Sequence, residues 1–479
     1  MTYSQFLNMI PEAVLVLLLI VVFIADFATS KQAERRWFNP FVSVLMLGAF
    51  VISAVPWEPQ SLFGGMYVTT AATNVMKAIL AGATLIVVIM SRQWLDKTDT
   101  KLREGEFYML VISTLLGMYT MMSAGHFLMF FLGLEMASVP MACLVALDKW
   151  RNDSAEGAAK YILTAAFSSG VMLMGLSLLY GACGTLYFNG VADKLQPSLL
   201  TIAAVVFFLS GLGFKISLVP FHFWTADTYQ GAPTVVTGYL SVVSKGAAAF
   251  TLMVILMKVF AHMTIFSQYF LYIVIVLSIT VANLFAIRQS ELKRFMAFSS
   301  ISQAGYIMLA LVGNDTTSPT ALMYYILVYV VANLAVFSII SVVEQNNEGK
   351  TDIDAYNGFY KTNPKLSFLM TLALFSLAGI PPFAGMFSKF FVFLAAGKMM
   401  NTAAYIVLFI ALVNTVVSLY YYLLIVKAMY IKNEDNPLPT FKSDCGTRLA
   451  LAICTAGVFL FGIASCLYDY IYRAAEMSF

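Results

Sequence analysis

Long apolar segments separated by short polar connections run through the whole of this 479-residue chain. A helix that crosses a membrane needs about 20 mostly apolar residues. This pattern is typical of an all-α polytopic membrane protein. Fourteen helices are predicted, at residues 10–29, 38–56, 72–90, 106–122, 126–147, 157–182, 199–224, 232–257, 267–287, 294–313, 318–343, 366–397 (interrupted), 402–426 and 449–472.

Composition agrees with this class, because 60% of the residues are hydrophobic and only 11% are charged. Soluble domains have about 45–50% apolar and about 25% charged residues. The net charge of +3 is too small to indicate a nucleic-acid partner. The five cysteines form no CxxC pair, and neither a GxGxxG unit on a strand and helix nor a phosphate-binding loop occurs. We therefore expect no metal, iron–sulfur or nucleotide site in this chain.

Lysine and arginine are divided unevenly between the two sets of alternating connections. The set that begins with KQAERRW (31–37) and includes the 288–294 and 427–448 connections holds nineteen, while the opposite set and both termini hold four. Basic residues favour the cytoplasmic side of a membrane. Both termini are therefore predicted outside, and the bias and the length favour a bacterial plasma (inner) membrane.

Five lysines remain after this count, and all lie inside predicted helices: Lys77, Lys160, Lys215, Lys245 and Lys389. Lys77 and Lys160 lie near helix ends, where a long side chain can reach the interface. The other three cannot, and Lys245 is almost at the centre of its helix. Glu135, about eight residues into the fifth helix, is the matching acid.

A charge at the bilayer centre costs about 2.5–3.5 kcal/mol on insertion scales. One interpretation is that the three central lysines hold helices together by pairing with carbonyls or with Glu135. The other is a proton path. Burial lowers the pKa of a lysine and a neighbouring carboxylate raises it, so a lysine between the two effects can take up and release a proton. Three lysines and one glutamate in four helices favour the proton path.

Two of the predicted helices contain prolines that break them. Pro220 cannot donate a backbone hydrogen bond, which frees the carbonyl of Ile216 beside Lys215. In the twelfth helix, Pro381 and Pro382 free the carbonyls of Leu377 and Ala378, a short distance before Lys389. Broken backbone inside a membrane is tolerated where it lines protein or water.

The seventh and twelfth helices are five apart in order, so they cross the membrane in opposite directions. Two such broken helices, each with a lysine, indicate two inverted five-helix repeats. The predicted domains are an N-terminal three-helix segment, two repeats and a C-terminal helix, at 1–105, 106–258, 259–432 and 433–479.

Other polar residues are weaker candidates. His222 follows Lys215 by two helical turns and is expected either to join a relay or to cap a helix end. SSISQAGY (299–306) brings hydroxyls and Gln303 into the tenth helix, where such side chains hold helices together or hold water. Glu12 and Asp26, near the ends of the first helix, are expected at the level of the lipid headgroups.

Several motifs together resemble those of the antiporter-like membrane subunits of respiratory complex I. They are GLGFKISLVPFHFWTADTYQGAP (211–233) with SK at 244–245, LGLEMASVP (132–140), AAKYILTAAFSSG (158–170), NLFAIRQSELKRFMAFSSISQAGY (283–306) and LFSLAGIPPFAGMFSKF (374–390). The resemblance covers roughly residues 100–430. The N-type branch, with its mitochondrial and chloroplast counterparts, fits best. M-type chains typically carry glutamate at the position of Lys389, and L-type chains are much longer.

The resemblance implies a coupling pair of Glu135 and Lys215 with Lys160 nearby, a central relay at Lys245, and an outer-exit site at Lys389. It also implies that quinone reduction elsewhere in the complex drives proton movement here. The chain would then be an enzyme only as a non-redox subunit. Flavin and iron–sulfur centres would belong to partner subunits, among which further antiporter-like and small membrane subunits are expected.

Two other functions stay open. The same fold occurs in multisubunit cation/proton antiporters, but sodium coordination favours clustered carboxylates and carbonyls, and Glu135 is the one acid clearly placed at depth. A purely structural scaffold is the other. It predicts that replacing the three central lysines leaves pumping unchanged.

Overall fold

The computed structural model describes residues 4–29, 35–96, 103–313, 315–347, 349–432 and 438–479. Their backbone forms a bundle of helices with one small antiparallel hairpin, β1 (Gln60–Leu62) and β2 (Tyr67–Thr69). The helices are α1 (Ser4–Leu7), α2 (Ile10–Thr29), α3 (Phe38–Ala54), α4 (Ala71–Met90), α5 (Arg92–Leu95), α6 (Glu104–Met122), α7 (Phe127–Val145), α8 (Asn152–Cys183), α9 (Phe188–Lys194), α10 (Leu199–Ile216), α11 (Phe223–Gly231), α12 (Thr234–Tyr239), α13 (Lys245–Lys258), α14 (Thr264–Ala286), α15 (Leu292–Leu309), α16 (Thr317–Asn346), α17 (Phe359–Thr362), α18 (Pro364–Ala378), α19 (Ala384–Gly397), α20 (Thr402–Tyr430), α21 (Cys445–Ile463) and α22 (Ser465–Glu476).

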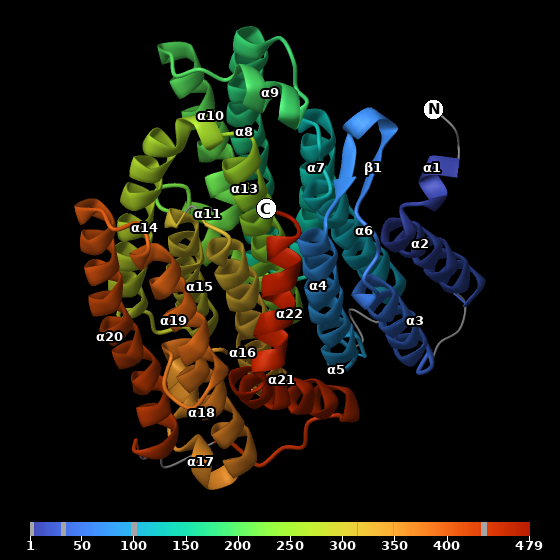
Figure 1. Cartoon of the computed structure of the whole chain (residues 1–479). Helices are drawn as coiled ribbons and strands as arrows, with labels where there is room; N and C mark the ends of the chain where they lie inside the picture. The colour runs from blue at the N-terminus through green and yellow to red at the C-terminus, as the bar shows by residue number, and fades with distance from the viewer. Residues whose placement is uncertain (1–3, 30–34, 97–102, 314, 348, 433–437) are drawn as a thin grey trace.

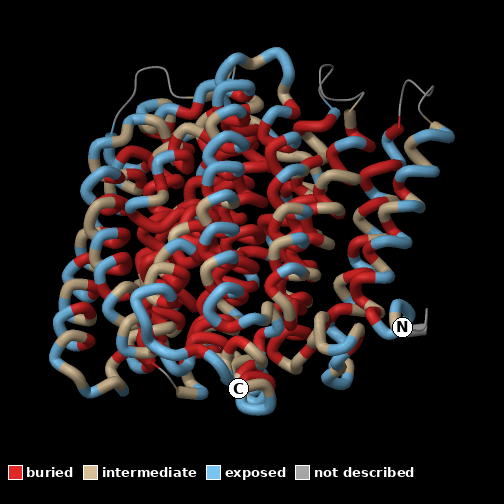
Figure 2. The backbone as a smooth tube through the Cα atoms, turned by 90° about the horizontal axis from the view of Figure 1, so that it is seen from above, coloured by how far each residue is buried: buried red, intermediate tan, exposed pale blue. Residues whose placement is uncertain are grey.

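The predicted all-α membrane fold is confirmed. Within the described residues, eleven helices are long and apolar enough to cross a membrane, and α3, α18 and α19 are shorter apolar helices. The N-terminal helices α2 and α3 lie at one end of the bundle and α20 at the other (Figure 1). Figure 2 shows the buried residues gathered in the middle of the bundle and the exposed ones around it. The segment from α12 to α13, α15 and α16 are almost entirely buried, so a charge near the middle of one of them is enclosed by protein.

The first break lies earlier than the sequence predicts. Instead of one kinked helix at 199–224, α10 ends at Ile216, and Ser217 adopts a left-handed conformation with φ 67°. The backbone N–H of Leu218 then bonds to the carbonyl of Gly213 at 2.9 Å. This closing bond is that of a Schellman cap. The helix is therefore already closed three residues before Pro220, and α11 begins after it.

The second break has the same construction. After α18 ends, Gly379 is left-handed with φ 88°, and the N–H of Ile380 bonds to the carbonyl of Phe375 at 3.0 Å. Pro382 follows Gly379 by three residues, as Pro220 follows Ser217. This shared construction supports the proposed repeats, although their boundaries stay a prediction.

The prediction of one helix at 449–472 was wrong. The structure divides this region into α21 and α22 at Ala464, which has φ −81° and ψ 85°. The sequence of α22, SCLYDYIYRAAE, carries charges on one side and buries Ile471 and Ala475 on the other. It packs against α16 and α4, so the end of the chain covers the bundle as a short amphipathic helix instead of extending α21.

The start of the described chain and its C-terminal end lie at the same edge of the bundle, the lower edge in Figure 2. This is the arrangement expected of an even number of membrane crossings. Parts of three basic connections, at 30–34, 97–102 and 433–437, lie outside the described residues.

Candidate functional site

Lys215 lies buried in the last turn of α10, directly before the first break. Its Nζ donates hydrogen bonds to Ser138 Oγ on α7 at 2.7 Å and to Tyr161 OH on α8 at 3.1 Å. The ammonium also lies 5.7 Å from the centre of the Tyr161 ring, within cation–π range. Two neutral hydroxyls therefore hold this charge, and each can itself donate a further hydrogen bond.

Glu135 lies one turn before Ser138 on α7 and is half-buried. Its carboxylate accepts a hydrogen bond from Ser169 Oγ on α8. Among the described residues no carboxylate forms an ion pair with Lys215, so Glu135 and Lys215 are not in direct contact. Ser138 links the two residues, because it lies on the same helix as Glu135 and its hydroxyl accepts a hydrogen bond from Lys215. Their role as a coupling pair stays a prediction.

Lys160 lies apart from this buried charge. Its side chain is 42% exposed and forms ion pairs with Glu156 at 2.5 Å and with Asp227 at 2.7 Å. Asp227, on α11, also pairs with Arg294 on α15 at 2.5 Å. The structure thus brings Lys160 to the surface cluster around Asp227 rather than to Lys215, whereas the next residue, Tyr161, contacts Lys215.

Lys245 begins α13 and is buried inside the bundle. The preceding segment, η3 (Leu240–Ser244), is a π-helical turn between α12 and α13, a feature often found at functional sites. The Nζ of Lys245 donates to Ser300 Oγ on α15 at 2.7 Å and lies 5.4 Å from the ring centre of Tyr229. Its predicted burial is confirmed, but nothing in the sequence pointed to the π-helical turn.

Lys389 lies buried in α19, after the second break. Its Nζ donates to the carbonyl oxygen of Ala378 at 2.8 Å, and Gln303 Nε2 donates to the neighbouring carbonyl of Leu377 at 3.2 Å. These are the two carbonyls that Pro381 and Pro382 were predicted to free. Both are therefore accessible to side chains, one to a lysine and one to an amide.

One face of α15 connects Lys245 with Lys389. Ser300 accepts from Lys245, Gln303 reaches the second break, and the Tyr306 ring centre lies 5.0 Å from Lys389 Nζ. These three residues of α15 are spaced three apart and so share a face. A cavity of about 10 Å³ adjoins Gln303 and Lys389, close to the minimum that holds one water. Two hydroxyls that line it or lie beside it, Tyr329 OH and Ser376 Oγ, have no hydrogen-bond partner within the described residues.

His222 does not share a helix face with Lys215, because the break separates them. It is buried at the N-terminus of α11, and its Nδ1 has no hydrogen-bond partner among the described residues. The side chain does not cap α11 either. The structure therefore places His222 within the break and leaves its predicted part in a relay as a prediction.

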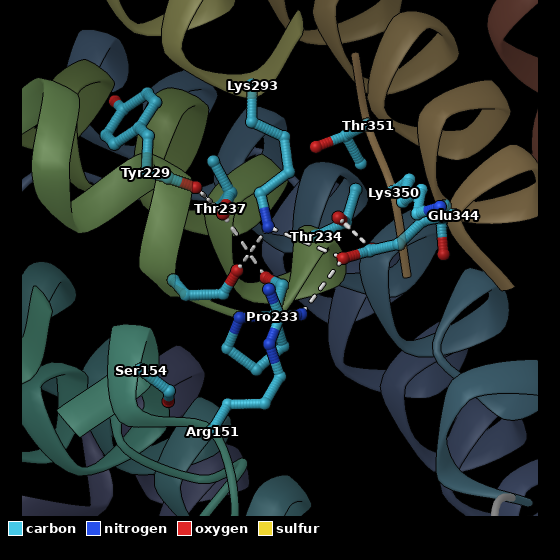
Figure 3. Close-up of polar contacts among 12 residues, drawn as sticks. Arg151, Ser154, Tyr229, Pro233, Thr234, Thr237, Lys293, Glu344, Lys350 and Thr351 are labelled. Atoms are coloured by element: carbon cyan, nitrogen blue, oxygen red, sulfur yellow. Dashed lines mark hydrogen bonds and ion pairs between the residues drawn. The ribbon is translucent and has the colours of Figure 1, made fainter. Parts of the chain in front are cut away.

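A second group of buried charges was not foreseen from the sequence. Glu344, near the end of α16, accepts from Arg151 Nη1 at 3.1 Å and from Thr234 Oγ1, and lies 3.6 Å from Lys293 Nζ (Figure 3). Lys293 also donates to the carbonyl of Ala232 at 2.9 Å. Lys293 was counted as a residue of a basic connection, yet it is buried. The group ties the start of α12 to α15 and α16, from one proposed repeat to the other.

Glu12 and Lys77 form a further buried ion pair, with Lys77 Nζ 2.6 Å from Glu12 Oε1. Tyr67 OH donates to the other oxygen of Glu12 at 2.9 Å. The expectation that Lys77 reaches the interface was wrong, because the side chain is fully enclosed by protein. The β1–β2 hairpin, which carries Tyr67, covers the pair, and this cover explains the difference. Glu12 lies in the first turn of α2, and its expected position at the level of the headgroups stays a prediction.

The sequence and the fold of this chain are similar to those of known membrane proteins. The family described as NADH:quinone oxidoreductase/Mrp antiporter matches residues 124–418. NADH-quinone oxidoreductase subunit N of Phocaeicola vulgatus is 55% identical over 98% of both chains. A chain of respiratory complex I from Thermus thermophilus is 29% identical with a TM-score of 0.81, covering 98% of this chain and 100% of that one. A chain of the Mrp complex from Dietzia is 19% identical with a TM-score of 0.86, covering 98% and 97%, a likeness of fold alone.

Proposed function

Because this chain belongs to the family of NADH-quinone oxidoreductase subunit N, we propose that it is a proton-translocating membrane subunit of an NADH:quinone oxidoreductase. NADH oxidation and quinone reduction take place in partner subunits that carry the flavin and iron–sulfur centres. This chain acts as a non-redox subunit. Its neighbours in the membrane are other subunits of the assembly, including antiporter-like and small ones, and the lipid bilayer.

The observation that carries the proposal is the buried polar series from Lys245 through Ser300 and Gln303 to Lys389. Burying an ammonium in the membrane is costly, so each lysine depends on the few acceptors around it. A movement that removes one acceptor favours release of the proton, and a movement that restores it favours uptake. Lys215, held by two hydroxyls near Glu135, is positioned to transmit such a movement from the first break.

A cation/proton antiporter is the second candidate, and the fold of the Mrp chain is compatible with it. The chemistry of the series favours protons, because its charged members are lysines, and a lysine repels sodium. Buried Glu12 and Glu344 are each already paired with a cation. Sodium-dependent proton exchange by proteoliposomes that contain this chain alone would favour the antiporter.

Lys245→Ala in the assembled complex tests the proposal. In inverted membrane vesicles we expect NADH-driven acidification to fall at least about tenfold, the equivalent of about 1.4 kcal/mol, and Lys245→Arg to keep part of it. Lys149→Ala, an exposed lysine in a connection, is the control and keeps full pumping. Unchanged pumping in Lys245→Ala would favour a scaffold role.

We also propose a bacterial plasma membrane with both termini outside. The nineteen basic residues of one set of connections support this orientation. A C-terminal alkaline phosphatase fusion should be active and a C-terminal fluorescent-protein fusion dark, and the reverse pattern would overturn the orientation.

A further inference from the structure

A groove of about 740 Å³ runs between α18 and α21, away from the buried lysines. Its walls are apolar and include Leu366 and Leu369 of α18 and Leu451 and Phe459 of α21. The groove adjoins helices that cross or lie in the membrane, so its apolar walls are accessible to lipid chains rather than to bulk water.

One end of this groove is strongly basic. Lys365, Lys442 and Arg448 all line it and are exposed, and none of the described residues that line it is acidic. None of the three forms an ion pair with a described residue, although Arg448 Nε donates to the Ser443 carbonyl at 2.9 Å. The positive end of α18 lies at the same end and adds to the field, whereas the carboxylate of Asp444 caps the N-terminus of α21.

Hydrogen bonds fix the backbone at the basic end of the groove. Asn363 donates to the Pro439 carbonyl at 3.1 Å and accepts from the N–H of Phe441 at 3.2 Å. Thr440 Oγ1 donates to the Thr362 carbonyl at 3.0 Å. These bonds fix the segment that carries Lys442 against the start of α18, so the three cations are held around one opening.

We infer that this groove binds an anionic phospholipid, with the phosphate of the headgroup among Lys365, Lys442 and Arg448 and an acyl chain along α18 and α21. The three cations belong to the 344–365 and 427–448 connections, which the charge bias assigns to the cytoplasmic side. Basic pockets between membrane helices on that side suit anionic headgroups. A free phosphate ion would contact the basic end of the groove but not its apolar walls. A phospholipid can contact both, so the groove favours a lipid.

Photolabelling of the assembled complex tests this inference. The complex is reconstituted into phosphatidylcholine vesicles that contain phosphatidylglycerol with a diazirine in its acyl chain, and the labelled peptides are identified by mass spectrometry. We expect label on α18 and α21, and at least about tenfold less in the Lys365→Gln/Lys442→Gln/Arg448→Gln variant. A phosphatidylcholine probe should label these peptides far less.

A matched control variant removes three positive charges elsewhere on the cytoplasmic side. Lys149→Gln/Arg288→Gln/Lys427→Gln replaces three exposed basic residues that do not line the groove, and it should keep the label. If the groove variant fails to assemble, competition in the wild-type complex decides: unlabelled phosphatidylglycerol should displace the probe and inorganic phosphate should not. Equal labelling by both lipids, displacement by phosphate, or crosslinks to a neighbouring subunit inside the groove would overturn the inference.

Discussion

The Nζ of Lys389 on α19 bonds to the carbonyl oxygen of Ala378, the last residue of α18, across the break between these half-helices at 2.8 Å. Pro382 has no N–H to offer this carbonyl, so the lysine side chain takes the place of a backbone donor. The ammonium stabilises the broken backbone, and the break gives the buried ammonium an acceptor. The position of the charge is therefore coupled to the geometry of the break.

Replacing Lys389 should strongly reduce proton translocation without unfolding the chain. Lys389→Met keeps the apolar stem and removes the donor, so we expect NADH-driven acidification in vesicles to fall at least about tenfold. Lys389→Arg should keep part of it, because it remains a donor. Native gels establish that both variants assemble. Full pumping by an assembled Lys389→Met complex would show that this lysine only supports the fold.

Gln303 should matter for pumping because it bridges α15 to the second break. Gln303→Leu keeps the volume but leaves the Leu377 carbonyl without its amide donor, at a cost of about 1–3 kcal/mol. We expect a several-fold loss of pumping in vesicles. Met308→Leu, also buried on α15, is the control and should be neutral. Equal effects of the two changes would mean that α15 responds only to packing.

Counting charges along the sequence was enough to find the central lysines. A lysine far from both ends of a predicted membrane span must be enclosed by protein, and Lys215, Lys245 and Lys389 are all buried, although the structure divides the predicted spans beside them. The backbone rule for proline likewise located the freed carbonyls of Leu377 and Ala378, and both have side-chain donors.

The same reasoning fails near helix ends, where distance along the chain does not say what covers a residue. Lys77 and Lys293 lie close to helix ends, yet both are buried. The β1–β2 hairpin covers Lys77, and the connection between α11 and α12 contacts Lys293. Lys160 lies about as far into its helix as Lys77 does, and its side chain is 42% exposed. The missing information is tertiary: which connection folds back over which helix end.

Glu344 should be important for stability. Glu344→Gln removes the carboxylate that faces buried Lys293, and breaking a buried pair costs about 3–5 kcal/mol. We expect less assembled complex on native gels and a lower unfolding temperature in detergent. Combining it with Lys293→Met removes the unpaired charge and should restore part of the loss. A double variant as unstable as the sum of the single ones would show that the two residues do not interact.

The ion pair between Asp315 and Lys398 predicts that the stability of the folded chain depends slightly on pH. Burial raises the pKa of the Asp315 carboxyl, but hydrogen bonds from Thr317 and Lys398 outweigh it, so the pKa is lowered. A depressed carboxyl pKa contributes stability above its unfolded value, and the contribution is lost as the pH falls through the folded value. The side chain of Asp315 is 37% exposed and that of Lys398 is 44% exposed, which limits the contribution to about 1 kcal/mol or less. The unfolding temperatures of wild type and Asp315→Asn should therefore differ slightly at neutral pH and converge in acid. A difference that grows in acid would contradict this sign.

The Glu12–Lys77 pair should affect assembly but not pumping, because it lies outside the series between Lys245 and Lys389. Lys77→Met leaves Glu12 buried without its cation, at a cost of about 3–5 kcal/mol, and we expect less assembled complex on native gels. Glu12→Gln/Lys77→Met leaves no unpaired charge and should recover part of the assembly. Proton translocation, normalised to the amount of complex, should equal the wild type in both variants, in contrast to Lys245→Ala. A fall in normalised pumping in Lys77→Met would instead make Lys77 a member of the proton path, with the hairpin residue Tyr67 as its next hydrogen-bond partner.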